Sequence, residues 1–154
     1  VVALTDLGEY DAMHIQNSKW NATAGARTPY NKANRLYETL VQDNPSVRDI
    51  QQVSSVMQSI GMEMSEDYEK IESARLLNSS EYTLNAALGY ISLRAALNQD
   101  EVLAVAYEYT YAGQVYQVGE FSTDAGESLK APNALLLKML KSSNNAPYMK
   151  NKGT

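Results

Sequence analysis

Cysteine is absent from this chain of 154 residues, and histidine occurs once, at His14. Without cysteine the protein has neither a disulfide framework nor a thiolate metal site. The chain also contains no G-x-S-x-G turn, so neither a serine nor a cysteine hydrolase has its nucleophile and base. We therefore expect no catalytic residue.

Long apolar runs and a surplus of basic residues are missing as well. No stretch approaches the ~20 apolar residues of a membrane-spanning helix, so we do not expect this module to span a membrane. The formal net charge is −5, whereas nucleic-acid binders present a basic surface to phosphates. No nucleic-acid partner is expected. The chain begins at Val1 without a signal-like segment and ends at Thr154, which is typical of a segment excised from a larger protein.

What is present indicates a folded domain. Hydrophobic residues make up 44% and charged residues 20% of the chain, the balance of a globular protein. We expect one α+β module over residues 1–141 and a frayed tail over residues 142–154. The expected architecture is an antiparallel sheet with a prominent hairpin in the C-terminal half. A helical hairpin and a short terminal helix are expected to pack on it.

Two helices are predicted between Thr28 and Gly61, and they should form the helical hairpin. The first begins at Thr28-Pro29, a capping hydroxyl followed by proline, and ends before Pro45. Its apolar residues recur at helical spacing: Ala33, Leu36, Tyr37, Leu40 and Val41. In the second helix Ser46 and Asp49 resemble a capping box, and Gly61 lies at the C-cap. Its apolar stripe consists of Val47, Ile50, Val53, Met57 and Ile60.

Shorter segments complete the predicted fold. Residues 1–4 fit an edge strand, and residues 6–27 are polar and irregular. Residues 68–76 fit a strand or a helix, and we favour a strand because the segments that follow are β-like. Residues 89–93 predict a further strand. Residues 133–141 predict the terminal helix, with apolar positions at Leu135, Leu136, Met139 and Leu140.

The clearest β pattern is a hairpin over residues 102–121. A two-residue turn at Ala112-Gly113 places Tyr109 opposite Tyr116 and Tyr107 opposite Val118. One face of the hairpin then carries Leu103, Val105, Tyr107, Tyr109, Tyr111, Tyr116 and Val118. A type I′ turn requires positive φ at both turn positions, which alanine disfavours, so a bulged three-residue turn is the competing register.

Tyrosine is abundant, with 11 residues against a single Phe and a single Trp. The tyrosines of the hairpin have two interpretations. In the first they face the core, and the helices cover the end of the hairpin from Leu103 to Tyr107. In the second the tip stays partly exposed and docks a partner, which makes Tyr109, Tyr111 and Tyr116 a possible interaction surface.

Two polar groups fit a metal ion poorly. Glu9, Asp11 and His14 match no ligand spacing on a helix face, so a polar loop histidine is favoured. The second group is acidic: Glu63, Glu66, Asp67, Glu69 and Glu72. It lacks the alternating Asp or Asn residues and central Gly of a calcium loop, so a solvated charged face is favoured. No glycine opens a phosphate-binding loop. We expect no metal and no cofactor.

Four stretches resemble one known family. They are residues 74–85, 88–93, 100–110 and 114–122, which read ARLLNSSEYTLN, LGYISL, DEVLAVAYEYT and QVYQVGEFS, and residues 1–9 are also similar. The family is SprA (Sov) of the Bacteroidetes, the proteins of gliding motility and type IX secretion. Members often have Asn before the turn glycine, where this chain has Ala112. The two predicted helices carry no motif of the family.

The resemblance implies a very large outer-membrane protein whose barrel is the conduit of type IX secretion. That machinery exports folded cargo such as adhesins and proteases, and the resemblance implies no enzymatic activity. The chain lacks the long alternating strands and aromatic girdles of a lipid-facing barrel wall. We therefore expect a soluble insertion in the cell envelope, on the extracellular or the periplasmic side. Its partners would be other parts of the parent protein, accessory subunits of the translocon or secreted cargo.

Two other classes of function stay open. A free-standing cell-surface domain would bind a glycan or a peptide through its tyrosines and Trp20. An enzyme is disfavoured because no catalytic constellation is visible. A broad exposed apolar or tyrosine patch would favour an assembly element, whereas a concave aromatic groove would favour ligand binding.

Overall fold

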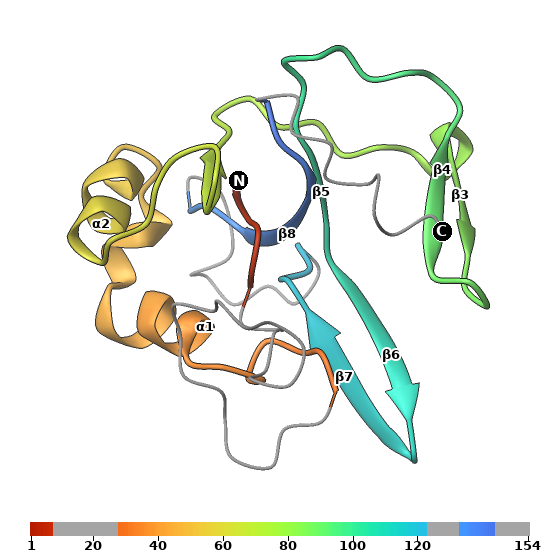
Figure 1. Ribbon diagram of the computed structural model, residues 1–154, viewed down its shortest axis with the longest axis horizontal. Helices are drawn as coiled ribbons and strands as arrows, with labels where there is room; N and C mark the ends of the chain where they lie inside the picture. Colours follow the sequence, from red (N-terminus) through yellow and green to blue (C-terminus); the bar gives the residue numbers. More distant parts are fainter. Residues whose placement is uncertain (8–27, 123–132, 144–154) are drawn as a thin grey trace.

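The computed structural model describes residues 1–7, 28–122 and 133–143. Figure 1 shows a four-stranded sheet beside the helical segments, and two separate β-hairpins that extend away from them. Helices and mostly antiparallel strands lie in different parts of the structure, so the α+β class predicted from the sequence is confirmed.

The four-stranded sheet joins the two ends of the described chain. Its strands are β2 (Tyr68–Lys70), β1 (Val2–Leu4), β8 (Leu136–Lys141) and β5 (Leu103–Val105), in that order. β1 pairs antiparallel with β2 and parallel with β8, and β8 pairs antiparallel with β5. The predicted edge position of residues 1–4 is therefore wrong. β1 is internal to the sheet, and all three of its residues are buried.

The prediction of a terminal helix over residues 133–141 is also wrong, because residues 136–141 form β8. The apolar residues of this segment fit both a helical and an extended period, so local pattern did not decide between them. The sheet decides, since β8 fills the place between β1 and β5. There its peptide groups find partners on two sides, and Leu136 and Met139 become fully buried.

The first predicted helix is shorter than expected. It consists of α1 (Leu36–Glu38), which continues as the π-helical turn η1 (Thr39–Asp43). It begins at Leu36 rather than at Thr28 because the buried Asn34 side chain accepts a hydrogen bond from the Leu36 amide at 3.0 Å. The predicted end at Asn44-Pro45 is confirmed.

The second predicted helix is broken. A 3-10 helix, η2 (Pro45–Arg48), is separated from α2 (Val53–Ser59) by an extended Asp49. The Asp49 carboxylate accepts hydrogen bonds from the Gln51 amide (3.0 Å) and the Gln52 side chain (2.9 Å), so it organises the turn before α2 and is not part of a capping box with Ser46. The helix ends close to the predicted place: Ile60 is the C-cap, and Gly61, with φ of +80°, is the left-handed residue that follows it.

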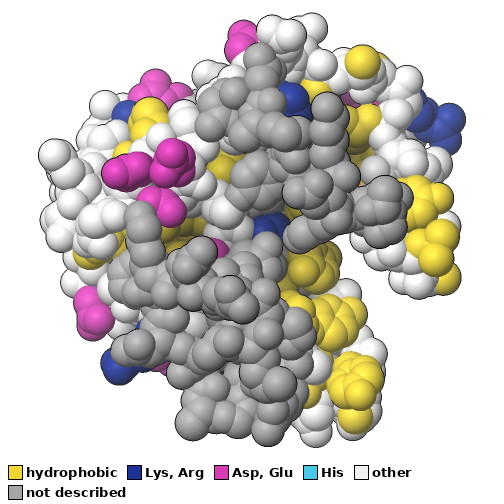
Figure 2. All heavy atoms as spheres, viewed as in Figure 1, with side chains coloured by type: hydrophobic (Ala, Val, Ile, Leu, Met, Phe, Trp, Pro, Cys, Tyr) yellow, Lys and Arg dark blue, Asp and Glu magenta, His cyan; other side chains and the backbone are white. Residues whose placement is uncertain are grey.

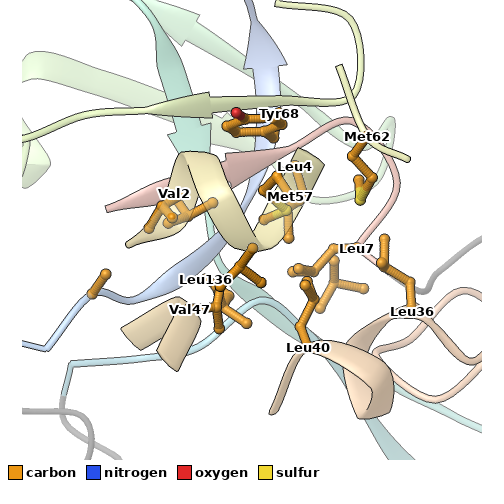
Figure 3. Close-up of a cluster of buried hydrophobic side chains, with 14 residues drawn as sticks. Val2, Leu4, Leu7, Leu36, Leu40, Val47, Met57, Met62, Tyr68 and Leu136 are labelled. Carbon is orange, nitrogen blue, oxygen red and sulfur yellow. The ribbon is translucent and has the colours of Figure 1, made fainter. Parts of the chain in front are cut away.

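The hydrophobic core lies between the sheet and the helical segments (Figure 3). The predicted face of the second helix is confirmed, because Val53 and Met57 are buried while Gln51 and Ser55 are exposed. Ile50 and Ile60 pack partly buried against the same core. The labelled core residues in the close-up are Val2, Leu4, Leu7, Leu36, Leu40, Val47, Met57, Met62, Tyr68 and Leu136.

Two hairpins extend beyond the hydrophobic core. One is formed by β3 (Tyr82–Asn85) and β4 (Tyr90–Leu93), preceded by a short 3-10 helix, η3 (Ser79–Glu81). The other is formed by β6 (Tyr107–Tyr111) and β7 (Gln114–Val118). Of the predicted strands, the one at 89–93 is confirmed as β4, and only the first three residues of 68–76 are extended, as β2. From residue 71 through residue 117 no side chain is buried.

The packed part reaches past the predicted domain boundary at residue 141. Ser142 is buried, and Ser143 donates hydrogen bonds to the Glu69 carboxylate through its hydroxyl (2.6 Å) and its amide (3.2 Å). The rest of the predicted tail lies outside the described residues. Among the residues that are described, no helix has the length and apolar character needed to cross a membrane.

Candidate functional site

The turn of the β6–β7 hairpin has the predicted two-residue register. Tyr109 pairs with Tyr116, Tyr107 pairs with Val118, and Thr110 pairs with Val115. Ala112 and Gly113 have φ angles of +51° and +78°, as a type I′ turn requires. The competing three-residue turn is therefore excluded, even though an alanine occupies a left-handed position.

The register gathers four tyrosines, which we call the tyrosine face: Tyr107, Tyr109, Tyr111 and Tyr116. The rings of Tyr109 and Tyr116 stack with their centroids 5.4 Å apart, and those of Tyr107 and Tyr109 lie 6.3 Å apart. Tyr109 and Tyr116 are half-buried, whereas Tyr111 at the tip is 61% exposed. The three residues proposed from the sequence are thus brought together, with Tyr111 as the most accessible of them.

A segment that the sequence did not indicate covers part of the tyrosine face. Tyr30 contacts Tyr116 edge-to-face, with ring centroids 5.3 Å apart. The hydroxyl of Tyr109 donates a hydrogen bond to the carbonyl oxygen of Pro29. Pro29 was expected to start a helix, but it lies outside the helix and its carbonyl oxygen contacts the hairpin through Tyr109. No local pattern reveals this contact, because 80 residues separate its two partners.

The outer edge of β7 is closed by Asn31. The Asn31 amide donates a hydrogen bond to the Gln117 carbonyl at 2.8 Å. Its side chain then donates to the Gly119 carbonyl (3.1 Å) and accepts from the Gly119 amide (2.8 Å). Asn31 therefore continues the ladder where a further strand would lie.

The expected continuous face from Leu103 to Tyr111 is divided between two sheets. Leu103 and Val105 are half-buried and belong to β5, which pairs with β8. The β6–β7 pairing begins only at Tyr107, which is 37% exposed. On the tyrosine face, Tyr30 packs against the ring of Tyr116.

A buried ion pair holds the base of the hairpin. Glu120 follows β7 by two residues, and its carboxylate forms a bidentate pair with Arg48, with the Nη2–Oε2 bond at 2.6 Å. The same carboxylate accepts from the Tyr37 hydroxyl (2.7 Å) and from the Leu136 amide (2.8 Å). Arg48 also donates to the Ala134 carbonyl at 3.1 Å. This node of Arg48, Glu120 and Tyr37 connects the β6–β7 hairpin to the helical segments and to β8.

The chemistry of this node is structural. A carboxylate offers about four lone-pair sites, and four protein donors occupy those of Glu120, so the hydrogen-bonding capacity of this buried carboxylate is met within the fold. Burial, followed by the charge of Glu120, raises the pKa of the Tyr37 hydroxyl above its ordinary value. Tyr37 therefore remains a protonated donor at neutral pH.

The β3–β4 hairpin exposes large apolar side chains. Leu84 and Leu88 are 64% and 73% exposed, and Leu76, in the segment that precedes the hairpin, is 87% exposed. Its base is ordered by polar contacts, because Glu81 accepts from the Asn78 amide at 2.7 Å and from Arg75 at 2.9 Å. Figure 2 shows hydrophobic side chains gathered over both hairpins, with a hollow between them. The sequence pattern did not indicate β3 or this second exposed patch.

The acidic residues between Glu63 and Glu72, which were weighed as a calcium site, make separate contacts. The Asp67 carboxylate accepts a hydrogen bond from the Glu63 amide at 2.8 Å. Glu69 is buried, and its carboxylate accepts a hydrogen bond from the Ser143 hydroxyl. The Glu72 carboxylate oxygen Oε1 lies 3.4 Å from Lys70 Nζ. Within residues 1–7, 28–122 and 133–143, no three His, Cys, Asp or Glu side chains are arranged to hold a metal ion. Glu9, Asp11, His14 and Trp20 lie outside the described residues.

Comparison with protein-family models, with curated proteins and with solved structures gives no match. The site consists of two hairpins, of which β6–β7 reaches the core through Val118, together with a tyrosine face and exposed leucines.

Proposed function

We propose that this chain is a non-catalytic structural and interaction module of a large outer-membrane protein that forms a type IX secretion translocon. In this role it serves the export of surface proteins and gliding motility, and it lies in the cell envelope on the extracellular or the periplasmic side. Its partners are other parts of the parent protein, accessory subunits or secreted cargo. The assignment to this translocon rests on the resemblance to the SprA family over residues 1–9 and 74–124.

The single observation that carries the interaction role is the absence of any buried side chain from residue 71 through residue 117. This span contains the β3–β4 hairpin, all of the β6–β7 hairpin except the buried Val118 at its base, and most of the segments that resemble the SprA family. An isolated two-stranded hairpin is marginally stable in water, since it lacks a second layer to pack on. A partner surface supplies the missing layer.

The exposed side chains support the same role. Five apolar or aromatic side chains are each more than half exposed: Leu84 and Leu88 on the β3–β4 hairpin, Leu76 in the segment before it, and Tyr111 and Val115 on the β6–β7 hairpin. Apolar patches of this kind mark surfaces that bind other proteins. Tyr109 and Tyr116 stack on each other, and Tyr30 packs edge-to-face on Tyr116, so the rings of Tyr109 and Tyr116 are used for packing. This arrangement favours an assembly contact over the alternative of a glycan- or peptide-binding surface domain.

The experiment is a secretion assay in the parent protein. Tyr109 and Tyr111 are both replaced by serine, and Tyr111 is also replaced alone, because its exposed ring contributes least to the fold. We expect both variants to reduce export of cargo while the protein is still made and folded. Gln51→Ala, at an exposed position in the turn before α2, is the matched control and should leave export unchanged. Normal export by a folded protein with both Tyr109 and Tyr111 replaced by serine would contradict the proposed contact.

A further inference from the structure

The two edges of the β6–β7 hairpin differ. The outer edge of β7 is occupied by Asn31, which donates to the Gln117 carbonyl and bonds both peptide groups of Gly119. The outer edge of β6 has no strand beside it, because β6 pairs with β7 and with no other described strand. One edge is closed and the other is open.

The register shows which groups the open edge presents. In a hairpin with a two-residue turn, the residues that flank the turn exchange hydrogen bonds, and every second residue does the same. Tyr107, Tyr109 and Tyr111 therefore bond to β7, while the amides and carbonyls of Glu108 and Thr110 point away from it. Within the described part of the chain these outward groups of Glu108 and Thr110 have no hydrogen-bond partner.

We propose that β6 accepts an extended strand of a partner polypeptide by β-sheet addition along Glu108 and Thr110. The proposal rests on the interaction role argued above and names the kind of partner. Main-chain hydrogen bonds to an open sheet edge supply affinity in this mode of recognition, and alternate side chains supply specificity. An open edge is otherwise a template for aggregation, which proteins usually avoid by covering it.

The side chains beside the edge define the chemistry of the partner strand. Residues 107–118 carry one formal charge, at Glu108, and the whole chain has a net charge of −5. A lysine or arginine next to Glu108 is therefore favoured, and an acidic residue is disfavoured. On the opposite face the new strand extends the tyrosine face, so its alternate residues are apolar or aromatic. A second copy of this chain fits less well, because it would bring a further net charge of −5 to the contact.

A proline at the open edge provides the test. Thr110→Pro removes an outward amide that β7 does not use, so the hairpin should keep its register while the edge loses a donor. Thr110→Val keeps the amide and is the matched control. The probe is a capped peptide of about eight residues in which Lys alternates with Val and Tyr. We expect Thr110→Pro to weaken its binding about threefold to tenfold, the equivalent of one net hydrogen bond, and Thr110→Val to leave it unchanged.

The charge preference is tested independently of the proline. A second peptide carries Glu in place of Lys and should bind wild type more weakly, whereas Glu108→Lys should reverse that order. The reversal should fade at high salt, because exposed charges are screened. If circular dichroism shows that Thr110→Pro does not fold, the proposal is tested by Glu108→Lys with the two peptides alone. Failure of Glu108→Lys to change the preference then contradicts the proposal.

Three further results would overturn it. They are equal binding by folded Thr110→Pro and Thr110→Val, no binding of the Lys peptide to wild type, and a dimer that Thr110→Pro dissociates. The dimer would identify a second copy as the occupant of the edge. Failure here is distinguishable from failure of the proposed function. If replacing Tyr109 and Tyr111 abolishes export but the wild-type protein does not bind the Lys peptide, the interaction role of the tyrosine face is supported and strand addition at the β6 edge is contradicted.

Discussion

Arg48 and Glu120 lie 72 positions apart in the chain and form a bidentate ion pair in which their side chains are 13% and 4% exposed. The pair joins the 3-10 helix η2 to the end of the β6–β7 hairpin. Each partner also bonds the segment that enters β8, Arg48 through the Ala134 carbonyl and Glu120 through the Leu136 amide. Three parts of the fold that are distant in sequence therefore meet at one charged contact.

Glu120→Gln should destabilise the protein strongly. The amide keeps the shape of the carboxylate but leaves the Arg48 charge buried without its counterion. Breaking a buried pair from one side costs about 3–5 kcal/mol of unfolding free energy. Urea denaturation followed by circular dichroism measures the change. Glu72→Gln, which touches only the partly exposed Lys70, is the control and should be close to neutral. A loss below about 1 kcal/mol at Glu120 would show that the pair is not essential.

The register of the β6–β7 hairpin could be predicted because its determinants are local. Ala112-Gly113 closes the turn, and alternation places Tyr109 opposite Tyr116. The buried stripe of α2 followed from spacing in the same way. The members of the tyrosine face were identified on the same basis, although Tyr30 was not, because its contact with Tyr116 is made across the fold.

Long-range pairing explains the errors. Residues 136–141 satisfy a helical period, and the place for a strand between β1 and β5 exists only once both of those strands are positioned. The buried Glu120 could not be recognised either, since its partner Arg48 lies in a segment with an unremarkable pattern. The open edge of β6 could not be predicted either, because it depends on which described strands pair with β6, and the closure of the β7 edge by Asn31 is made across the fold.

Truncation of the α2 face should separate buried from exposed positions. Val53→Ala and Met57→Ala each leave a cavity in the core, and we expect each to lower the free energy of unfolding by ~1–4 kcal/mol. Gln51→Ala, at an exposed position just before α2, should be nearly neutral. Chemical denaturation of the three variants tests the prediction. Similar losses at Gln51 and Val53 would mean that the helix presents a different face to the core.

Ala112→Asn should stabilise the β6–β7 hairpin. Ala112 has a φ of +51°, a left-handed conformation that costs an ordinary L-residue roughly 1–2 kcal/mol and that Asn adopts more readily. We expect a gain of about 0.5–1 kcal/mol in unfolding free energy, together with slower amide exchange at Tyr111 and Gln114. Ala112→Val, whose branched side chain tolerates positive φ poorly, should change stability in the opposite direction. A destabilised Asn variant would contradict the turn geometry.

Gly113 and Gly119 offer a matched pair in which backbone strain and steric conflict can be told apart. Both have positive φ, at +78° and +81°. A Cβ at Gly113 would meet no atom within 4 Å, whereas a Cβ at Gly119 would lie 2.9 Å from the Cβ of Ala106 and 3.2 Å from the Val105 carbonyl oxygen. The chain crosses closely at Gly119 because β5 continues into β6 at this point, beside the end of β7.

Gly113→Ala should therefore lose about 1 kcal/mol of unfolding free energy from backbone strain alone. Gly119→Ala should lose a further ~1–3 kcal/mol, because the new methyl group forces the two strands apart. Adding Ala106→Gly to Gly119→Ala removes the closest of these contacts but leaves those with the Cα of residue 106 (3.0 Å) and the Val105 carbonyl oxygen (3.2 Å), so it should restore part of that excess. Urea titration of the three variants gives the comparison. Equal losses at the two glycines, or no rescue by Ala106→Gly, would show that the close crossing between Gly119 and Ala106 does not limit the packing at the base of the hairpin.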